Sequence, residues 1–197
     1  MGDVDHRKGP RRRGEELNQA IFTAALDELT EVGYPRLTME RIAERARTSK
    51  ASLYRRWPGR AELVMDAVLH LLPTVDDLPD TGELRGDLLT ALRAMAATLN
   101  SPLGVATRTM ITELATDIET VQRQKERFLE RRNQLMLGLV RRAVARGEAR
   151  PEALTPLVAC VGPAMLRDHF LANGGPIPDD VVVDIIDQVV VPLIRAV

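Results

Sequence analysis

A short stretch near the N-terminus holds the side chains of this chain that are best suited to nucleic-acid chemistry. Within residues 37–60 these are Lys50, Tyr54, Arg55, Arg56 and Trp57. Lysine and arginine neutralise phosphates and donate to guanine O6 and N7, while tyrosine and tryptophan combine a flat ring with one polar atom. A short basic helix supported by a second short helix places side chains in the major groove of DNA. The pattern therefore predicts DNA recognition.

Other kinds of chemistry find no support in the sequence. The histidines, His6, His70 and His169, lack H-x-x-x-H and H-E-x-x-H spacing, and Cys160 lies nine residues from His169, too far to face it closely on one helix. Glycine-rich phosphate loops and nucleophile-elbow motifs are absent from the sequence. We therefore expect no enzyme activity, no metal site and no cofactor, with Cys160 as a small apolar filler.

Two short helices around a tight corner are expected to position the basic residues. Thr38 can cap the first helix, whose apolar face would consist of Met39, Ile42, Ala43 and Ala46. The corner is Arg47-Thr48-Ser49, and Ser49 can cap a second helix that runs from Lys50 to about Arg56. Upstream, residues 17–32 have apolar residues at helical spacing and end at Gly33. This longer helix is expected to complete a three-helix unit.

The same stretch resembles the N-terminal domain of the TetR family of bacterial transcription regulators. The matching segments, within residues 21–64, are AALDELTEVGYPRLTMERIAERA and SKASLYRRWPGRAELV. The resemblance implies a helix-turn-helix DNA-binding domain, a C-terminal domain with an inducer cavity, and a dimer formed by the last two helices of each subunit. Arg47 departs from the family, which usually has glycine at the corner. If that position needs positive φ, arginine is strained by about 1 kcal/mol, and either the turn differs or Arg47 reaches a phosphate.

The expected DNA contacts follow from these helices and from the resemblance. Lys50, helped by Arg55, would reach guanine O6 or N7, and Ala51 a thymine methyl group. Glu40 departs from the family pattern and would either accept a hydrogen bond from a cytosine amine or repel a phosphate. Phosphate contacts are expected from Thr38, Ser52, Tyr54, Trp57 and Arg60, with the rings of Tyr54 and Trp57 in the core and their polar atoms outward. The predicted set is Thr38, Glu40, Arg47, Ser49, Lys50, Ala51, Ser52, Tyr54, Arg55, Trp57 and Arg60.

Charge is distributed unevenly along the 197 residues. Residues 1–60 carry 13 Lys and Arg against 9 Asp and Glu, whereas residues 61–197 carry 14 against 19. The basic excess coincides with the expected DNA-binding helices, although a difference of four charges alone can also arise by chance. Residues 1–14 have no apolar pattern and are expected to be a flexible basic arm. This arm would touch phosphates or enter a minor groove, or it is a solvated tail.

The expected fold is all-α, with a helix-turn-helix domain over residues 15–60 and a larger helical domain over 61–197. After a loop at 73–82, apolar spacing predicts helices over 84–99, 105–116, 118–146, 155–172 and 179–196. The last segment is rich in Val and Ile. Helix is favoured over strand because its apolar residues fall at helical spacing with Asp184, Asp187 and Gln188 between them; they are Val182, Ile185, Ile186, Val189, Val190 and Leu193. The charged run at 123–132 is expected to be a solvated face. Since no run of 18 apolar residues and no secretory signal occur, a cytoplasmic protein without a membrane span is expected.

The resemblance also implies a small-molecule inducer bound in the second domain. Candidate lining residues are Met95, Leu99, Met110, Phe128, Met165 and His169. Because the chain has only six aromatic residues, such a cavity would be mostly aliphatic and suit a lipophilic ligand. Methionines at helical spacing also suit a core, and His169 also suits the surface. The expected function is a homodimeric, ligand-responsive repressor on a palindromic operator; the alternative is a helical small-molecule-binding or interaction protein without specific operator recognition.

Overall fold

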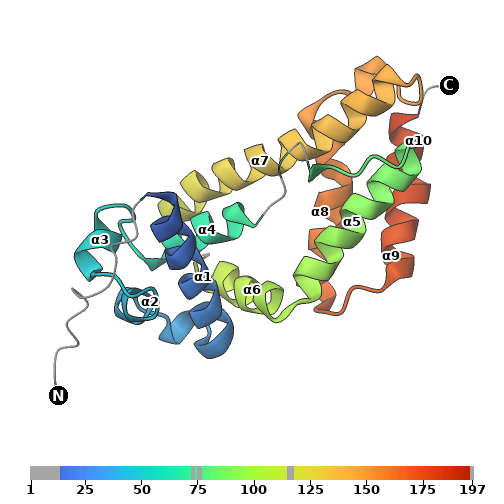
Figure 1. Ribbon diagram of the computed structural model, residues 1–197. Coiled ribbons are helices and arrows are strands. Elements are labelled where there is room, and N and C mark those ends of the chain that lie inside the picture. Colours follow the sequence, from blue (N-terminus) through green and yellow to red (C-terminus); the bar gives the residue numbers. More distant parts are fainter. Residues whose placement is uncertain (1–13, 72–73, 75–76, 115–117, 196–197) are drawn as a thin grey trace. The chain divides into compact units, whose positions relative to one another are not determined.

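The computed structural model describes residues 14–71, 74, 77–114 and 118–195, with side chains described outside 110–129 and 131–132 (Figure 1). The described residues form helices, with a single isolated bridge between Ala149 and Arg195 in place of a sheet. The predicted all-α class is confirmed. The chain divides into two compact units, residues 1–71 with 109–124 and residues 72–108 with 125–197. The basic arm predicted over residues 1–14 lies outside the described residues except for Gly14.

The first unit contains the predicted helical pair and its supports. Its elements are α1 (Glu15–Val32), the 3-10 turn η2 (Tyr34–Arg36), α2 (Met39–Arg45), α3 (Lys50–Tyr54) and α4 (Arg60–His70). As expected, α1 ends at Gly33, which adopts a φ of 73°. α3 is shorter than predicted, because Arg55 already forms its C-cap. α4 packs against α1 within this unit, whereas the sequence had assigned residue 61 onward to the second domain.

Each of the helices α1 to α4 contributes a fully buried aliphatic side chain to the core of the first unit. These side chains are Ile21 and Leu29 of α1, Ile42 of α2, Leu53 of α3 and Leu63 of α4. Burying one aliphatic side chain of this size stabilises a fold by about 1.5–3 kcal/mol. Since α3 has only five residues, Leu53 is the side chain that fixes it to the core.

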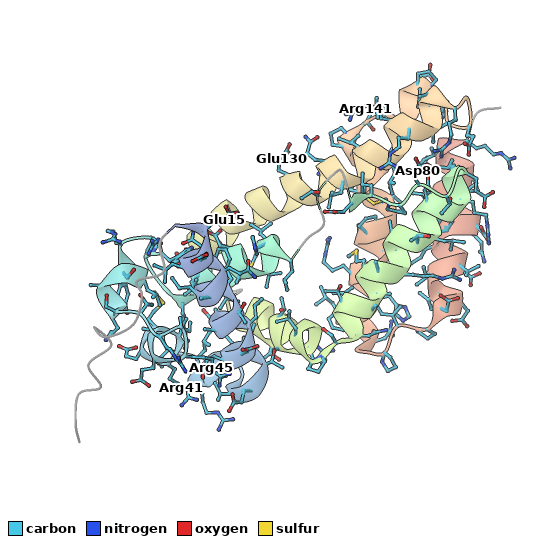
Figure 2. All side chains as sticks on the ribbon, viewed as in Figure 1. Glu15, Arg41, Arg45, Asp80, Glu130 and Arg141 are labelled. Carbon is cyan, nitrogen blue, oxygen red and sulfur yellow. The ribbon has the colours of Figure 1, made fainter. Side chains whose placement is uncertain are left out.

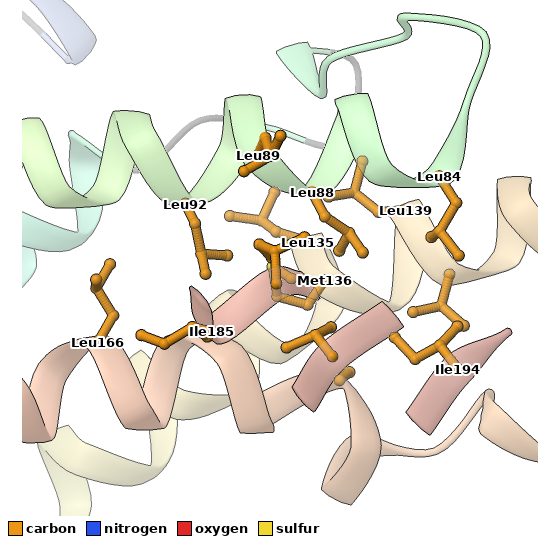
Figure 3. Packing of buried hydrophobic residues seen from close by; sticks show 14 of the residues in the cluster. Leu84, Leu88, Leu89, Leu92, Leu135, Met136, Leu139, Leu166, Ile185 and Ile194 are labelled. Carbon is orange, nitrogen blue, oxygen red and sulfur yellow. The ribbon is translucent and has the colours of Figure 1, made fainter. Parts of the chain in front are cut away.

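The second unit is larger and consists of longer helices. Its elements are α5 (Leu84–Asn100), α6 (Pro102–Leu114), α7 (Ile118–Ala145), the 3-10 turn η4 (Pro151–Ala153), α8 (Pro156–Asn173), α9 (Asp179–Asp184), the π-helix η5 (Ile185–Val190) and α10 (Val191–Ile194). The end of α6 and the start of α7 belong to the first unit. Figure 3 shows the core that these helices share, with Leu88 and Leu92 of α5 beside Leu135 and Leu139 of α7. Ile185 and Ile194 close it from the last helical segment.

The helix boundaries of the second unit agree with the predicted ones, with two differences. α8 begins as expected, since Thr155 caps it by accepting a hydrogen bond from the Val158 N–H at 3.3 Å. α6 begins at Pro102 rather than Val105, because the Ser101 hydroxyl accepts from the Gly104 N–H at 3.2 Å and proline suits the first helical position. The last segment is helical, as predicted, but its middle turn is a π-helix. No helix of the described residues is both long and apolar enough to cross a bilayer.

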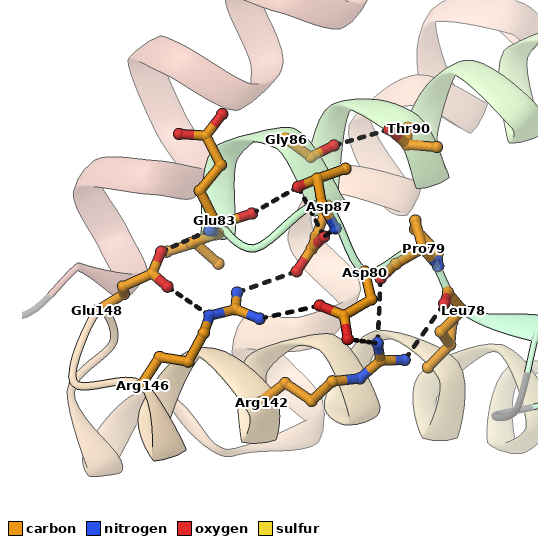
Figure 4. A network of polar contacts seen from close by, with 12 residues as sticks. Leu78, Pro79, Asp80, Glu83, Gly86, Asp87, Thr90, Arg142, Arg146 and Glu148 are labelled. Carbon is orange, nitrogen blue, oxygen red and sulfur yellow. Dashed lines mark hydrogen bonds and ion pairs between the residues drawn. The ribbon is translucent and has the colours of Figure 1, made fainter.

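A network of charged side chains joins the loop before α5 to the end of α7 (Figure 4). Asp87, which is 1% exposed, accepts from the Thr81 N–H at 2.6 Å and from Arg146 Nη2 at 3.0 Å. Arg146 also donates to Glu148, which in turn accepts from the Leu84 N–H at the start of α5. Burial by itself raises the pKa of Asp87, but the hydrogen bonds from Thr81 and Arg146 outweigh it and leave that pKa below its usual value.

Candidate nucleic-acid interface

The turn between α2 and α3 is a helix C-cap with an arginine in the left-handed conformation. The Thr48 N–H donates to the Ala43 carbonyl at 2.9 Å, and the Arg47 N–H to the Glu44 carbonyl at 3.1 Å. This pair of bonds defines a Schellman motif, whose C′ residue is usually glycine. Arg47 occupies that place with a φ of 54°, the positive φ for which a glycine was expected. The turn geometry is therefore the usual one, and Arg47 bears the strain.

Both short helices begin at the predicted caps. The Thr38 hydroxyl accepts from the Arg41 N–H at 3.2 Å, and the Ser49 hydroxyl from the Ser52 N–H at 3.2 Å. Leu53 is fully buried and holds α3 to the core. Ser49, Lys50, Ala51, Tyr54 and Arg55 are all exposed around it. Of the predicted contact residues of α3, Ser52 is partly exposed and the others are exposed, as are Thr38, Glu40 and Arg47 on α2 and the turn.

The two aromatic residues of this region do not lie as expected. The Trp57 indole is 5% exposed, and its Nε1–H donates to Asp66 Oδ2 on α4 at 2.9 Å. Its ring meets Phe22 of α1 edge to face, with ring centroids 5.6 Å apart. The expectation that Trp57 turns its polar atom outward is therefore wrong, because that atom is bound inside the unit. Tyr54 is 47% exposed, so the expectation of a ring in the core is also wrong for this residue.

Arg60, expected at a phosphate, takes part in internal contacts. Its Nη1 donates to the Leu37 carbonyl at 2.6 Å, and its guanidinium lies 4.4 Å from the centroid of the Tyr34 ring. These contacts join the start of α4 to the segment that precedes α2. Arg60 therefore helps to position the helical pair in the free protein, while a phosphate contact from its remaining N–H groups stays a prediction.

The cations of α2 are neutralised by α1, which the sequence did not predict. Glu28 of α1 is 3% exposed and accepts from Arg41 Nε at 2.7 Å and Arg45 Nε at 2.9 Å. Arg41 and Arg45 lie one turn apart on α2 (Figure 2), and Arg45 also pairs with Glu31. The signal for Glu28 was its place seven residues after Ile21, within the apolar stripe of α1. A carboxylate in such a stripe needs a cationic partner.

The exposed cations of α3 and the turn differ in their partners. Lys50 forms an ion pair with Glu40, across the turn. Arg56 donates from Nη1 to the Ser52 hydroxyl at 2.8 Å. Arg47 and Arg55 make no hydrogen bond or ion pair through their side chains with any residue in the described part of the chain. Arg47 and Arg55 are thus the guanidinium groups most accessible to phosphates here.

The candidate ligand-binding residues are spread over the second unit. Met95 and Leu99 are partly buried and pack against the core, whereas Met165 is 39% exposed on α8. The His169 ring lies 3.3 Å from the Asn173 amide one turn further along α8. The side chains of Met110 and Phe128, and most of the charged run at 123–132, lie outside those described. A groove of about 610 Å³ occurs in the first unit, lined by Glu16, Gln19, Ala20, Thr23, Ala24, Asp27, Arg45 and Ala46.

Comparison with known proteins covers nearly the whole chain. Residues 21–67 match the family of bacterial regulatory proteins called tetR, and residues 78–189 match a tetracyclin repressor-like C-terminal domain. The DNA-binding transcriptional repressor TetR of Mycobacteroides abscessus is 33% identical over 190 residues, covering 93% of this chain and 96% of the relative. An uncharacterized HTH-type transcriptional regulator of Bacillus subtilis, YdeS, is 30% identical over 181 residues, covering 91% and 90%.

A solved structure agrees with these relatives. The crystal structure of the TetR family transcription regulator SCO0332 matches with a TM-score of 0.77 and 26% identity, covering 89% of this chain and 97% of that one. The chain belongs to the TetR family of bacterial transcription regulators and is a helix-turn-helix regulator.

Proposed function

We propose that this protein is a ligand-responsive repressor that binds a roughly palindromic operator as a homodimer in the bacterial cytoplasm. The observation that carries the proposal is the exposure of Lys50, Ala51, Tyr54 and Arg55 on α3, while Leu53 fixes this helix to the core. A short helix held in this way enters a major groove with its first residues toward the bases. The M. abscessus relative, named as a repressor, supports the sign of regulation.

Base recognition is assigned to the first turn of α3. Lys50 donates to guanine O6 or N7, with Arg55 close enough to assist, and Ala51 contacts a thymine methyl group. Phosphates are bound by residues around this turn, which set the register of the helix without reading sequence. Those residues are Thr38, Arg47, Ser49, Ser52 and Tyr54. Their exposure or partial exposure on α2, α3 and the turn supports this assignment.

The proposed dimer is formed by α8 and the last helical segment. α8 leaves three large apolar side chains exposed, Leu157 at 76%, Met165 at 39% and Leu171 at 44%. Met165 and Leu171 follow Leu157 by eight and fourteen residues, which places all three on one side of a helix with 3.6 residues per turn. Apolar residues gathered on one exposed side favour contact with a partner, here a second copy of the chain. Two copies would present two α3 helices to successive major grooves.

The inducer is proposed to bind in the second unit and to be lipophilic. This proposal is supported by the aliphatic character of the helices that would surround it, with Met95 and Leu99 partly buried at the edge of the core and the partly buried His169 on α8 as a polar group. Binding would lower the affinity for DNA by favouring a dimer in which the spacing of the two α3 helices no longer fits the operator.

Selection of duplexes from a random pool, followed by footprinting on the DNA that flanks the gene, tests the proposal. We expect enrichment of one palindrome, protection of both half-sites, and a dimer by sedimentation. Lys50→Ala should weaken binding by about 1–3 kcal/mol and relax selection at one base position. Equal weakening on every sequence would make Lys50 a phosphate contact. A monomer, or a protein that prefers no duplex, would instead favour a small-molecule-binding or interaction protein.

A further inference from the structure

Glu40 is an acidic side chain on the surface that is proposed to meet DNA. Its carboxylate forms an ion pair with the Lys50 ammonium, and the two side chains are 48% and 50% exposed. Glu40 is the second residue of α2 and Lys50 the first of α3, so the pair bridges the two helices across the turn. The hydrogen bond between them lowers the pKa of Glu40 and raises that of Lys50, so both side chains are charged at neutral pH.

The position of this carboxylate is selective among the nearby cations. Arg41 and Arg45 both form ion pairs with Glu28 of α1. The side chains of Arg47 and Arg55 have no such partner among the described residues. Glu40 thus neutralises the cation placed to read bases and leaves the accessible guanidinium groups uncompensated. A carboxylate whose only effect was repulsion of phosphates would weaken binding to every duplex alike.

We propose that Glu40 is a specificity-determining residue that keeps Lys50 from phosphates on non-operator DNA and releases it to base acceptors in the operator. The inference rests on the proposed function. To leave Glu40, Lys50 must find acceptors that replace the carboxylate oxygens. Guanine O6 and N7 offer two neighbouring acceptors, which together replace the two carboxylate oxygens. On other sequences Lys50 meets no such pair, and the phosphates are bound by Arg47 and Arg55, whose side chains have no partner to leave in the described part of the chain. Loss of the Glu40–Lys50 ion pair is therefore compensated by base acceptors in the operator and poorly compensated on other DNA.

A double-mutant cycle separates this role from a direct effect of Glu40 on DNA. The variants are Glu40→Gln, Lys50→Met and the double variant, all at exposed positions. The matched control is Glu44→Gln, which removes the same charge from an exposed position on the same helix, where no described residue pairs with the carboxylate. The probes are the duplex selected by the wild-type protein and a scrambled duplex of the same length. Affinity is measured for both across a salt series.

Glu40→Gln should raise affinity for the scrambled duplex about 2- to 5-fold, as expected for loss of an exposed ion pair, and affinity for the selected duplex by less. The salt dependence on the scrambled duplex should steepen by about one phosphate contact per protomer. In the Lys50→Met background, Glu40→Gln should neither raise affinity for the scrambled duplex nor steepen its salt dependence. Glu44→Gln should change both affinities by one common factor.

Three results are decisive against the inference. If Glu40→Gln changes affinity equally in the wild-type and the Lys50→Met backgrounds, Glu40 acts on DNA directly. Weaker binding of the selected duplex by Glu40→Gln means that Glu40 contacts a base. Either result overturns the inference and leaves the proposed function intact, because the wild-type protein still prefers its selected duplex. A wild-type protein without such a preference overturns both.

Discussion

Replacing Arg47 by glycine should make this protein more stable and a weaker DNA binder. Arg47 has a φ of 54° at the C′ position of a Schellman motif, which costs a non-glycine residue about 1–2 kcal/mol. Glycine removes that strain but loses about 0.5 kcal/mol more entropy on folding. The net gain is about 1 kcal/mol, which corresponds to a rise in melting temperature of about 2–4 °C for a chain of this size.

The loss in DNA binding follows from the exposed guanidinium. If Arg47 binds one phosphate in each protomer, the dimer loses two contacts, and the slope of log affinity against log salt falls by about 1.8. This difference in slope acts over the tenfold range between 1 M and 0.1 M salt. Arg47→Gly should therefore bind DNA up to about 60-fold more weakly than wild type at 0.1 M salt. The loss should be similar on operator and non-operator duplexes, because phosphate contacts carry no sequence information.

Two control variants separate strain from charge. Arg47→Ala keeps the left-handed strain and removes the guanidinium, so it should weaken DNA binding without raising the melting temperature. Gly147, with a φ of 77°, occupies the same C′ position after α7, where a Cβ would meet nothing within 4 Å. Gly147→Ala should therefore lower stability by about 1 kcal/mol without changing DNA affinity. Thermal unfolding and fluorescence anisotropy across a salt series measure these effects. If Arg47→Gly melts no higher than wild type, Arg47 is not strained, and if its salt slope is unchanged, Arg47 binds no phosphate.

Two further predictions concern the internal contacts. Trp57→Phe should lower the free energy of unfolding by about 1–2 kcal/mol, because it removes the hydrogen bond to Asp66, and should leave the salt dependence of DNA binding unchanged; a reduced slope in anisotropy titrations would restore Trp57 as a phosphate contact. Asp87→Asn should cost about 2 kcal/mol at pH 7, because it removes the charge that Arg146 and Thr81 bind. Since the folded pKa of Asp87 lies below its unfolded value near 3.9, its contribution is complete above about pH 4 and is lost as the pH falls through the folded pKa. Wild-type stability, followed by circular dichroism, should therefore fall more steeply than that of Asp87→Asn below about pH 4, and parallel curves would contradict this role for Asp87.

Local signals predicted the backbone of the helical pair well. Thr38 and Ser49 were expected to cap α2 and α3, and both hydroxyls accept the expected N–H. These interactions span three residues, so the sequence contains all that is needed to recognise them. The conformation of Arg47 could be predicted only in part from the sequence. The family's glycine suggested a positive φ, but only the bonds from Thr48 and Arg47 back into α2 show that the turn kept that geometry.

Side-chain partners were harder to predict, because they depend on which faces meet. Trp57 was expected to turn its indole nitrogen outward, and Asp66, nine residues later on α4, binds it instead. Glu28 lies 13 and 17 residues before the two arginines that it binds. Nothing in the spacing of α2 shows that Arg41 and Arg45 pair with a carboxylate of α1. The packing of α1 on α2 decides that, whereas the side chains of Arg47 and Arg55 have no partner among the described residues.

The last helical segment shows how a missed detail bears on assembly. The predicted apolar stripe of 179–196 included Val189 and Leu193, yet the side chains buried there are Val182, Ile185, Ile186, Val190 and Ile194. Four of these recur every four residues, a period longer than the 3.6 of an α-helix, and the wider π-helical turn of η5 accommodates it. The shift leaves Val189 and Leu193 only partly buried. Two aliphatic side chains that were expected in the core are therefore partly exposed on the segment proposed to pair with a second copy. Their exposure supports a dimer contact at this segment in addition to α8.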